Sequence, residues 1–365
     1  MDVMERARAA EAAGRRIIHM EVGQPGTPAP AGALAALRRA LDGPLGYTVS
    51  LGLPELRAGI AGLYRRWYGV DLDPARVVVT TGSSSAFILA FTALFDAGER
   101  VALGEPGYPS YRQILRALSL QPVGVPARME NRLQPVVEDL EGLDVAGLIV
   151  ASPGNPTGTL LDRAALARLA AWAEARGTAL VSDEIYHGLH YGDRAVSALE
   201  ITDKAWVINS FSKYFSMTGW RIGWMVVPED QVRRVERLAQ NLFICPPHAS
   251  QVAALAALDC TAELEANRKV YAENRRLMLE GLPKAGFATI APPDGAFYIY
   301  ADVGGLTDDS LRLAGEILDG AGVAVTPGID FDPVRGRRWM RFSYARATAD
   351  IAEGLERLAG FMAAR

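Results

Sequence analysis

The sequence has little cysteine, no long apolar run and no excess of basic charge. Its two cysteines, Cys245 and Cys260, match no metal-ligand spacing and offer no disulfide framework, so we expect no metal and a reducing, cytoplasmic location. No apolar stretch approaches the roughly 20 residues that span a bilayer, and the charged, alanine-rich first residues differ from a signal peptide, so no membrane association is expected. The net charge of −4, with both signs interspersed, argues against a nucleic-acid partner.

Half of the residues are hydrophobic and 22% are charged, which is typical of a globular chain that buries a large core. Between about residues 53 and 241, segments with helical periodicity alternate with short apolar runs. We expect helices at residues 54–68, 83–95 and 163–176, and strands at residues 76–80, 101–103, 148–151, 179–181, 206–208 and 222–227. This alternation predicts an α/β fold with a mostly parallel sheet and helices on both faces.

The pattern changes after about residue 258. A long charged helix at residues 262–282 precedes short strand-like and helical stretches, which predict a smaller α+β domain. A length of 365 residues also favours two domains. We therefore expect an N-terminal segment, residues 1–40, that packs with the small domain, a large domain, residues 41–258, and a small C-terminal domain, residues 259–365.

Ligands of parallel sheets bind beyond the carboxyl ends of the strands, so the residues that follow each strand are the expected site. Thr81, Gly82, Ser83 and Ser84 follow the first strand, and glycine with hydroxyls at a helix start suits a phosphate, although an ordinary helix cap looks the same. Asn155 is the only amide in the turn SPGNPTG, where it could equally bond its own backbone.

Two further strand ends carry charge. Asp183, followed by Tyr186 in SDEIY, is costly at a buried strand end without a cationic or donor partner, although aspartate also caps helices. Lys213 lies three residues after Ser210 and eight before Arg221, and could bind phosphate, attack an aldehyde or simply be solvated. A phosphate cradle, an amide, a buried carboxylate and a lysine in one domain together meet the needs of pyridoxal phosphate.

The motifs SPGNPTG, SDEIY and SFSKYFSMTGWRIGW occur in this order along the chain. With them the chain resembles the fold-type I, class I/II aminotransferases of the aspartate aminotransferase superfamily, from about residue 13 to residue 361. The resemblance implies pyridoxal 5'-phosphate as cofactor. It also implies transamination between an L-amino acid and a 2-oxo acid with ping-pong kinetics.

The resemblance assigns roles around the cofactor ring. Lys213 corresponds to the lysine that is bonded to the cofactor aldehyde and serves as the acid and base of the proton shift. Asp183 corresponds to the carboxylate that pairs with the pyridinium nitrogen, which keeps the ring protonated. Tyr186 and Asn155 correspond to the donors to the ring oxygen, and Asn155 also borders the substrate.

The resemblance further implies a phosphate clamp, in which arginine meets the phosphate oxygens in a bidentate manner. The residues that correspond to this clamp are Ser83, Ser84, Ser210, Ser212 and Arg221. Tyr108, in the segment EPGYP, corresponds to an aromatic residue stacked on the cofactor ring. For an arbitrary tyrosine, simple core packing is the commoner role.

Three more residues carry implications for substrate and assembly. Tyr47 corresponds to a tyrosine that reaches the phosphate of the neighbouring subunit, which implies an obligate symmetric homodimer. Arg341, in RFSYA, corresponds to the arginine that binds the substrate α-carboxylate, whereas a surface salt bridge is its ordinary alternative. Gly23 corresponds to the segment that lies over the substrate.

Two alternatives remain open from the sequence. A pyridoxal-phosphate lyase of the C–S or β-elimination type would use the same cofactor residues, and a ligand-sensing domain of a transcription regulator would share the fold. No basic recognition helix precedes the motifs, which disfavours the second. Family members often carry a longer segment where this chain has residues 23–28, so the sequence predicts neither the amino donor nor the acceptor.

Overall fold

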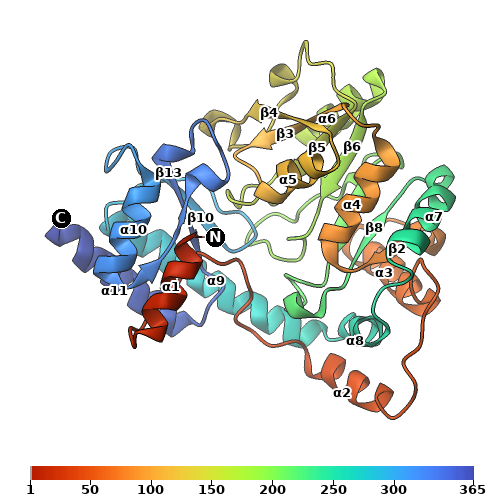
Figure 1. Cartoon of the computed structure of the whole chain (residues 1–365), viewed down its shortest axis with the longest axis horizontal. Helices are drawn as coiled ribbons and strands as arrows, with labels where there is room; N and C mark the ends of the chain where they lie inside the picture. The colour runs from red at the N-terminus through yellow and green to blue at the C-terminus, as the bar shows by residue number, and fades with distance from the viewer. Residues whose placement is uncertain (1) are drawn as a thin grey trace.

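The computed structural model describes residues 2–365. A seven-stranded sheet, in the order β2-β8-β7-β6-β5-β3-β4, forms the centre of the larger part of the molecule (Figure 1). Strand β8 runs antiparallel to both neighbours, and the other pairs are parallel. The strands are β2 (Val77–Thr80), β3 (Arg100–Glu105), β4 (Gln121–Pro126), β5 (Gly147–Ala151), β6 (Ala179–Asp183), β7 (Trp206–Ser210) and β8 (Gly223–Val226). The mostly parallel α/β fold predicted from the sequence is confirmed.

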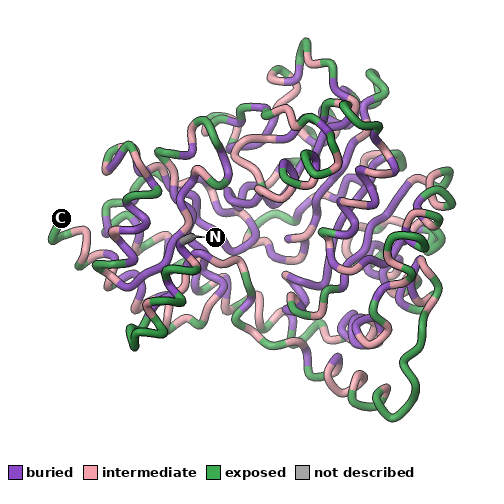
Figure 2. Tube along the Cα trace, in the orientation of Figure 1, coloured by how far each residue is buried: buried purple, intermediate pink, exposed green. Residues whose placement is uncertain are grey.

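Helices cover both faces of this sheet because its strands are apolar on both sides. In β2, Val77 and Val79 join one hydrophobic cluster and Val78 joins another. One face is covered by α4 (Gly82–Leu94), α5 (Pro109–Ala117) and α7 (Val232–Leu242), and the other by α3 (Pro54–Tyr68), α6 (Arg163–Arg176) and α8 (His248–Ala257). Figure 2 shows buried chain through the middle and exposed chain around it.

Local signals explain the helix ends that the sequence predicts best. Helix α6 begins where the Asp162 carboxylate accepts a hydrogen bond from the Ala165 amide at 2.7 Å, and it ends at Gly177, which has a φ of +66°.

Strand β4 was not expected from the sequence. It contains two prolines and lies at the edge of the sheet, where a missing amide donor is tolerated.

The smaller part contains a four-stranded antiparallel sheet in the order β12-β13-β10-β9. Its elements are α9 (Thr261–Lys284), β9 (Thr289–Ile290), β10 (Tyr298–Asp302), α10 (Ser310–Ala321), β11 (Val323–Ala324), β12 (Thr326–Pro327), β13 (Trp339–Ser343) and α11 (Thr348–Ala364). Figure 1 shows the long helix α9 running from the large part into the small one.

The first forty residues contact both parts of the molecule. Helix α1 (Asp2–Ala12) packs on α10, and β1 (Ile18–His19) pairs with β11, and both of these partners belong to the smaller part. Helix α2 (Ala31–Ala40) instead lies against α8, beside the large part (Figure 1). Ala33 of α2 is buried and α8 is rich in alanine, so both helices offer small apolar side chains for this packing. The boundaries at residues 40 and 258 stay predictions.

Candidate active site

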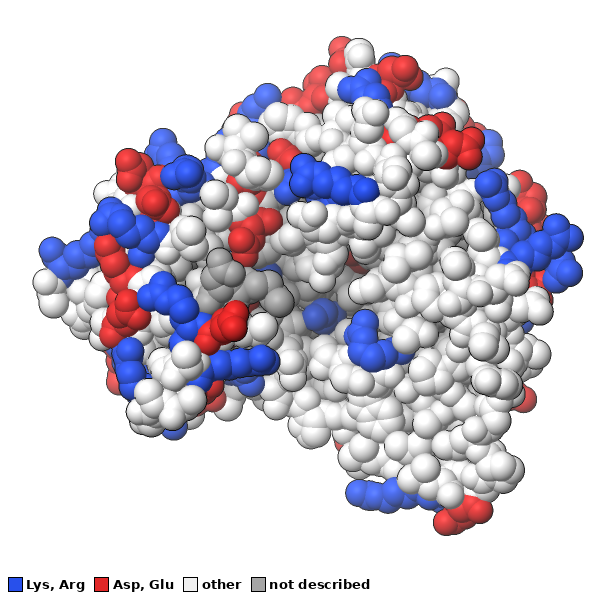
Figure 3. Space-filling view, viewed as in Figure 1, with Lys and Arg blue, Asp and Glu red and all other residues white. Residues whose placement is uncertain are grey.

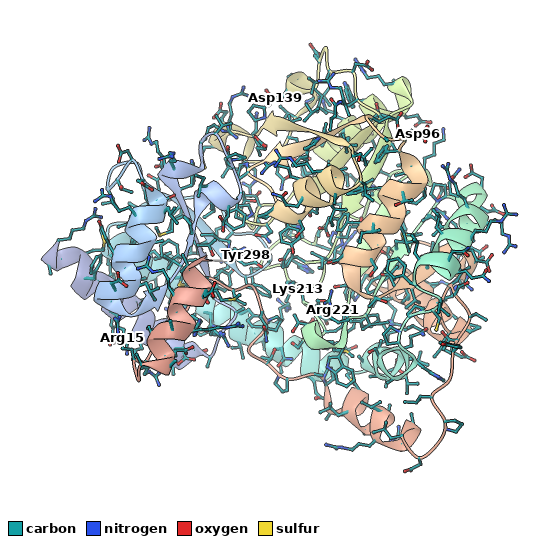
Figure 4. All side chains as sticks on the ribbon, viewed as in Figure 1. Arg15, Asp96, Asp139, Lys213, Arg221 and Tyr298 are labelled. Atoms are coloured by element: carbon teal, nitrogen blue, oxygen red, sulfur yellow. The ribbon has the colours of Figure 1, made fainter. Side chains whose placement is uncertain are left out.

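A cavity of about 880 Å³ lies between the two parts of the molecule. Figure 3 shows this hollow with Lys and Arg atoms inside it, and Figure 4 places Lys213, Arg221 and Tyr298 at the same position. The walls come from the carboxyl ends of the large sheet on one side, and from residues near 21–23, 298, 326–333 and 341 on the other. Its volume suits a cofactor together with a small substrate.

Asp183 ends strand β6 at the floor of the cavity, with its side chain buried. One carboxylate oxygen accepts a hydrogen bond from the Ile185 amide at 3.0 Å, and the other accepts one from the hydroxyl of Tyr111. Burial raises the pKa of Asp183 to about 6, while its donors and the charge of Lys213 act in the opposite direction. The carboxylate is therefore held ionised at neutral pH beside a space that a cation would occupy favourably.

Lys213 follows strand β7 and projects into the same cavity. Its Nζ donates a hydrogen bond to the carbonyl of Gly23 at 2.7 Å, so the lysine bridges the two walls. Burial lowers the pKa of Lys213 to about 8, and the charges of Arg341 and Arg221 add to this effect. The neutral amine, which is the form that acts as a nucleophile or a general base, is thus far more populated near neutral pH than in an ordinary lysine.

The start of helix α4 and Arg221 form one end of the cavity. Gly82 has a φ of +74°, and a Cβ atom there would collide with the guanidinium of Arg221. Ser83, Ser84, Ser212 and Arg221 all line the cavity, together with the free amides that open a helix. Ser210 does not line it. Its hydroxyl accepts a hydrogen bond from the Ser212 amide at 3.1 Å, which fixes the backbone next to this end of the cavity.

The turn that follows β5 holds Asn155 rigidly. The Gly154 amide donates to the Thr159 carbonyl at 3.0 Å and the Gly158 amide to the Gly154 carbonyl at 2.8 Å. Asn155 does not bond its own backbone through its side-chain oxygen. That oxygen accepts a hydrogen bond from Nη1 of Arg341 at 2.9 Å, which leaves the amide hydrogens available to the cavity.

Tyr186 and Tyr108 complete the large-part wall. The Tyr186 hydroxyl is buried and lies 2.8 Å from the hydroxyl of Tyr298. Tyr108 immediately precedes helix α5 and lines the cavity, with its ring edge-on to Tyr111 at a centroid distance of 5.4 Å. Both sequence-predicted tyrosines therefore border the same space as Lys213.

Arg341 in β13 provides a cation on the opposite wall and is only 7% exposed. Its Nη2 donates hydrogen bonds to the Glu21 carbonyl and, at 3.3 Å, to the Thr326 hydroxyl. Its Nε is buried without a partner among the described residues. A buried guanidinium with an unused donor, facing a cavity, is suited to a carboxylate ligand.

Tyr47 does not line the cavity of its own chain and is 84% exposed, on the stretch between α2 and α3.

Sequence reasoning missed Tyr111, Tyr298 and Phe331, which all line the cavity. Tyr111 could have been found, because it lies three residues after Tyr108 at the start of a helix and so shares its face. The described residues contain no helix long and apolar enough to cross a membrane, and no His, Cys, Asp or Glu cluster arranged to bind a metal.

The donor set fits pyridoxal phosphate. The cradle at Gly82 and Arg221 suits a phosphate, and the buried carboxylate of Asp183 suits a protonated ring nitrogen. Lys213, with its lowered pKa, suits an aldehyde carbon. Fold and site together define a pyridoxal-phosphate enzyme.

Comparison with known proteins gives the family. Residues 15–358 match the model of the aminotransferase class I and II family, and the chain belongs to this family. The valine–pyruvate aminotransferase of Mycobacterium tuberculosis is 46% identical over 99% of this chain and 95% of its own length. The crystal structure of a Silicibacter pomeroyi protein is 70% identical, with a TM-score of 0.96 over 100% of this chain and 96% of that one.

The aspartate aminotransferase of Thermus thermophilus with maleate is 32% identical and superposes with a TM-score of 0.93, over 99% of this chain and 95% of that one. The chain is a pyridoxal-phosphate-dependent aminotransferase, which transfers an amino group between an amino acid and a 2-oxo acid. The lyase alternative is not favoured, because these named relatives are aminotransferases.

Proposed function

We propose that Lys213 is the residue that binds the cofactor and moves the proton during transamination, while Arg341 holds the substrate carboxylate. The observation that carries this proposal is the position of Lys213. Its amine lies in the cavity between the two walls and donates a hydrogen bond to the Gly23 carbonyl. The charges of Asp183 and Arg341 affect its pKa.

Pyridoxal phosphate supplies an aldehyde that takes up the amino group and a ring that withdraws electrons from the α-carbon. Asp183 would hold the proton of the ring nitrogen, and Tyr186 and Asn155 would donate to the ring oxygen. Ser83, Ser84, Ser212 and Arg221 would bind the phosphate, and Ser210 positions the backbone of Ser212. Tyr108 would lie against the ring.

Arg341 binds the α-carboxylate and thereby orients the α-hydrogen toward Lys213. The Nζ of Lys213 would serve as the base that accepts this proton and as the acid that returns it within the cavity. Because burial lowers the pKa of Lys213 to about 8, the amine loses its proton more readily near neutral pH than an ordinary lysine does. Donor and acceptor use the same site in turn, which predicts ping-pong kinetics.

Replacement of the lysine tests this assignment. We expect Lys213→Ala to lose the visible absorbance of the lysine-bonded cofactor and about 10⁴-fold in turnover, because both the bond and the general base are removed. Lys204→Ala is the matched control, since Lys204 is an exposed lysine paired with Glu174. A Lys213→Ala protein with normal absorbance and turnover would refute the proposal.

We also propose that the amino donor carries an apolar side chain. The cavity lining includes the apolar side chains of Met4, Leu311, Ile329 and Pro333, alongside the charged side chains of Arg116 and Asp330. Nearby, the guanidinium of Arg112 is paired with the Glu105 carboxylate, so its charge is already compensated. The relative named valine–pyruvate aminotransferase is consistent with this wall.

A donor screen tests this specificity. With one acceptor held constant, we expect valine to react with a kcat/KM at least about tenfold above that of aspartate, because burying an uncompensated carboxylate against apolar walls is costly. A preference for aspartate would contradict the proposal about the donor and leave the role of Lys213 intact.

We further propose that the protein is a homodimer in which Tyr47 reaches the neighbouring active site. Tyr47 is exposed beside the exposed apolar side chains of Leu45, Val49 and Ile244. This stretch is fixed to the chain before α8, where the Thr48 amide donates to the sulfur of Cys245 at 3.4 Å. A second copy would cover this surface. The cytoplasmic location expected from the sequence stays a prediction.

Subunit mixing tests the shared site. Tyr47→Ala and Lys213→Ala homodimers should each be impaired, whereas a mixed dimer contains one site with Lys213 from one protomer and Tyr47 from the other. We expect activity to return when the two variants are refolded together. Mixed dimers that form without any recovery would contradict the role of Tyr47, and a monomer in light scattering would contradict the dimer.

A further inference from the structure

Tyr298 touches both the cofactor-side and the substrate-side residues of the cavity. It begins strand β10, which pairs with β13, the strand that carries Arg341. Its side chain is 1% exposed and lines the cavity. In Figure 4 it lies on the small-part side of the cavity, opposite Arg221. No role follows for it from the cofactor motifs, which all lie in the large part.

The hydroxyl of Tyr298 is directed toward the cofactor side. It lies 2.8 Å from the hydroxyl of Tyr186, the proposed donor to the ring oxygen. The space for this hydroxyl exists because residue 23 is a glycine, since a Cβ atom there would overlap the Tyr298 oxygen. The backbone that carries Gly23 is the same one that accepts the hydrogen bond from Lys213.

The ring of Tyr298 serves the substrate side. The Cζ atom of Arg341 lies 4.4 Å from the ring centroid of Tyr298 and 4.7 Å from the ring centroid of Phe331. Cations gain attraction over aromatic faces, and more so when they are desolvated. The guanidinium thus contacts two aromatic rings, and its Nη1 and Nη2 atoms are oriented by hydrogen bonds to Asn155, Glu21 and Thr326.

We propose that Tyr298 is a positioning residue with two separable functions, which rests on the proposed roles of Tyr186 and Arg341. Its hydroxyl donates to the Tyr186 oxygen, so that the single Tyr186 hydrogen is directed at the ring oxygen of the cofactor. Its ring supports the Arg341 guanidinium in the orientation that receives the α-carboxylate. The hydroxyl thereby affects the pH midpoint of the lysine-bonded cofactor, and the ring affects substrate binding.

Two substitutions separate these functions. Tyr298→Phe keeps the ring and removes the hydroxyl, and Tyr298→Leu removes both. In Tyr298→Phe we expect the pH midpoint of the absorbance change of lysine-bonded cofactor to rise by about 0.5–1 unit, because a weaker Tyr186 donor stabilises the anionic ring oxygen less. The KM for the amino donor should change less than about twofold, since the aromatic face remains.

In Tyr298→Leu we expect the same shift of the midpoint together with a KM increase of about five- to tenfold, because the cation loses one aromatic face. Tyr300→Phe is the matched control. Tyr300 lies two residues along the same strand, and its buried hydroxyl has no partner among the described residues, so neither quantity should move.

An unchanged midpoint in Tyr298→Phe would overturn the role of the hydroxyl. A KM that rises equally in the Phe and Leu variants would overturn the role of the ring. Circular dichroism and cofactor content verify that each variant is folded, and should the Leu variant not fold, Tyr298→Met replaces it under the same criteria. These outcomes are distinct from failure of the proposed roles on which they rest. Failure of the Tyr186 role would appear as an unchanged midpoint in Tyr186→Phe, and failure of the Arg341 role as an unchanged KM in Arg341→Lys.

Discussion

The two walls of the cavity are built in different ways. On the large-part wall, Asp183 is the last residue of β6 and Lys213 follows the end of β7, and the pairing of these neighbouring strands brings the two residues together. On the opposite wall, Arg341 depends on groups from distant segments, including the Glu21 carbonyl and the oxygen of Asn155.

This difference teaches how the site tolerates change. Backbone hydrogen bonds of a buried sheet position the first wall, so a substitution there alters the chemistry of one group and leaves its neighbours in place. Contacts between side chains from separate segments position the second wall, so a substitution there alters geometry and hence binding. We expect substitutions on the first wall to lower kcat and substitutions on the second wall to raise KM.

Asp183→Asn gives the largest effect in this comparison. We expect the cofactor still to bind, while kcat falls by about 10³-fold, because the amide cannot hold the ring nitrogen protonated. Single-turnover measurement of α-proton removal, with deuterated donor, checks this. A near-normal rate would show that Asp183 does not pair with the ring nitrogen.

Arg341→Lys tests the second wall. Lysine keeps the charge and loses the fork that binds a carboxylate in a bidentate manner, so we expect KM for donor and acceptor to rise about 10²-fold. The absorbance of the bound cofactor should stay as in the unmodified protein. If instead the absorbance changes and KM does not, the two walls are not separable in the way proposed.

Phe331→Leu should also raise KM, but by less than Arg341→Lys does. It removes one of the two rings against the Arg341 guanidinium, and we expect KM to rise about three- to fivefold with kcat nearly unchanged. Trp339→Leu serves as control, because Trp339 stacks on Tyr300 at 4.8 Å. Equal KM values for both variants would count against the aromatic support of Arg341.

The smallest expected effect concerns His19, which lies behind the second wall. Its ring nitrogens bond to Glu21 at 2.7 Å and to Glu11 of α1 at 3.0 Å, and chiefly the bond to Glu21 raises the pKa of His19 to about 9. Because the folded-state pKa lies above the unfolded value of about 6.5, this stabilisation is complete below pH 6.5 and is lost as the pH rises through 9.

We therefore expect His19→Gln to lower the melting temperature by about 1–2 °C at pH 6, with the difference from the unmodified protein disappearing above pH 9. Differential scanning calorimetry across this pH range measures it. A difference that stays constant with pH would show that the imidazolium is not the stabilising species.

The sequence by itself determined six of the seven strands of the large sheet, three of its covering helices and the residues at the strand ends. Apolar runs, helix caps and glycine stops act over a few residues, so local patterns alone could place Asp183, Lys213 and Asn155 at one edge of the sheet. The position of α2 against α8 was not accessible in this way, because its apolar face fits more than one surface.

Only the tertiary structure decided which side chains meet across the cavity. Tyr111 bonds to Asp183 over 72 positions of sequence, and Tyr186 to Tyr298 over 112 positions. Periodicity describes which face of an element is apolar and carries no information about which distant hydroxyl that face will meet. Those pairings follow from the packing of one part against the other, and the binding of substrate depends on them.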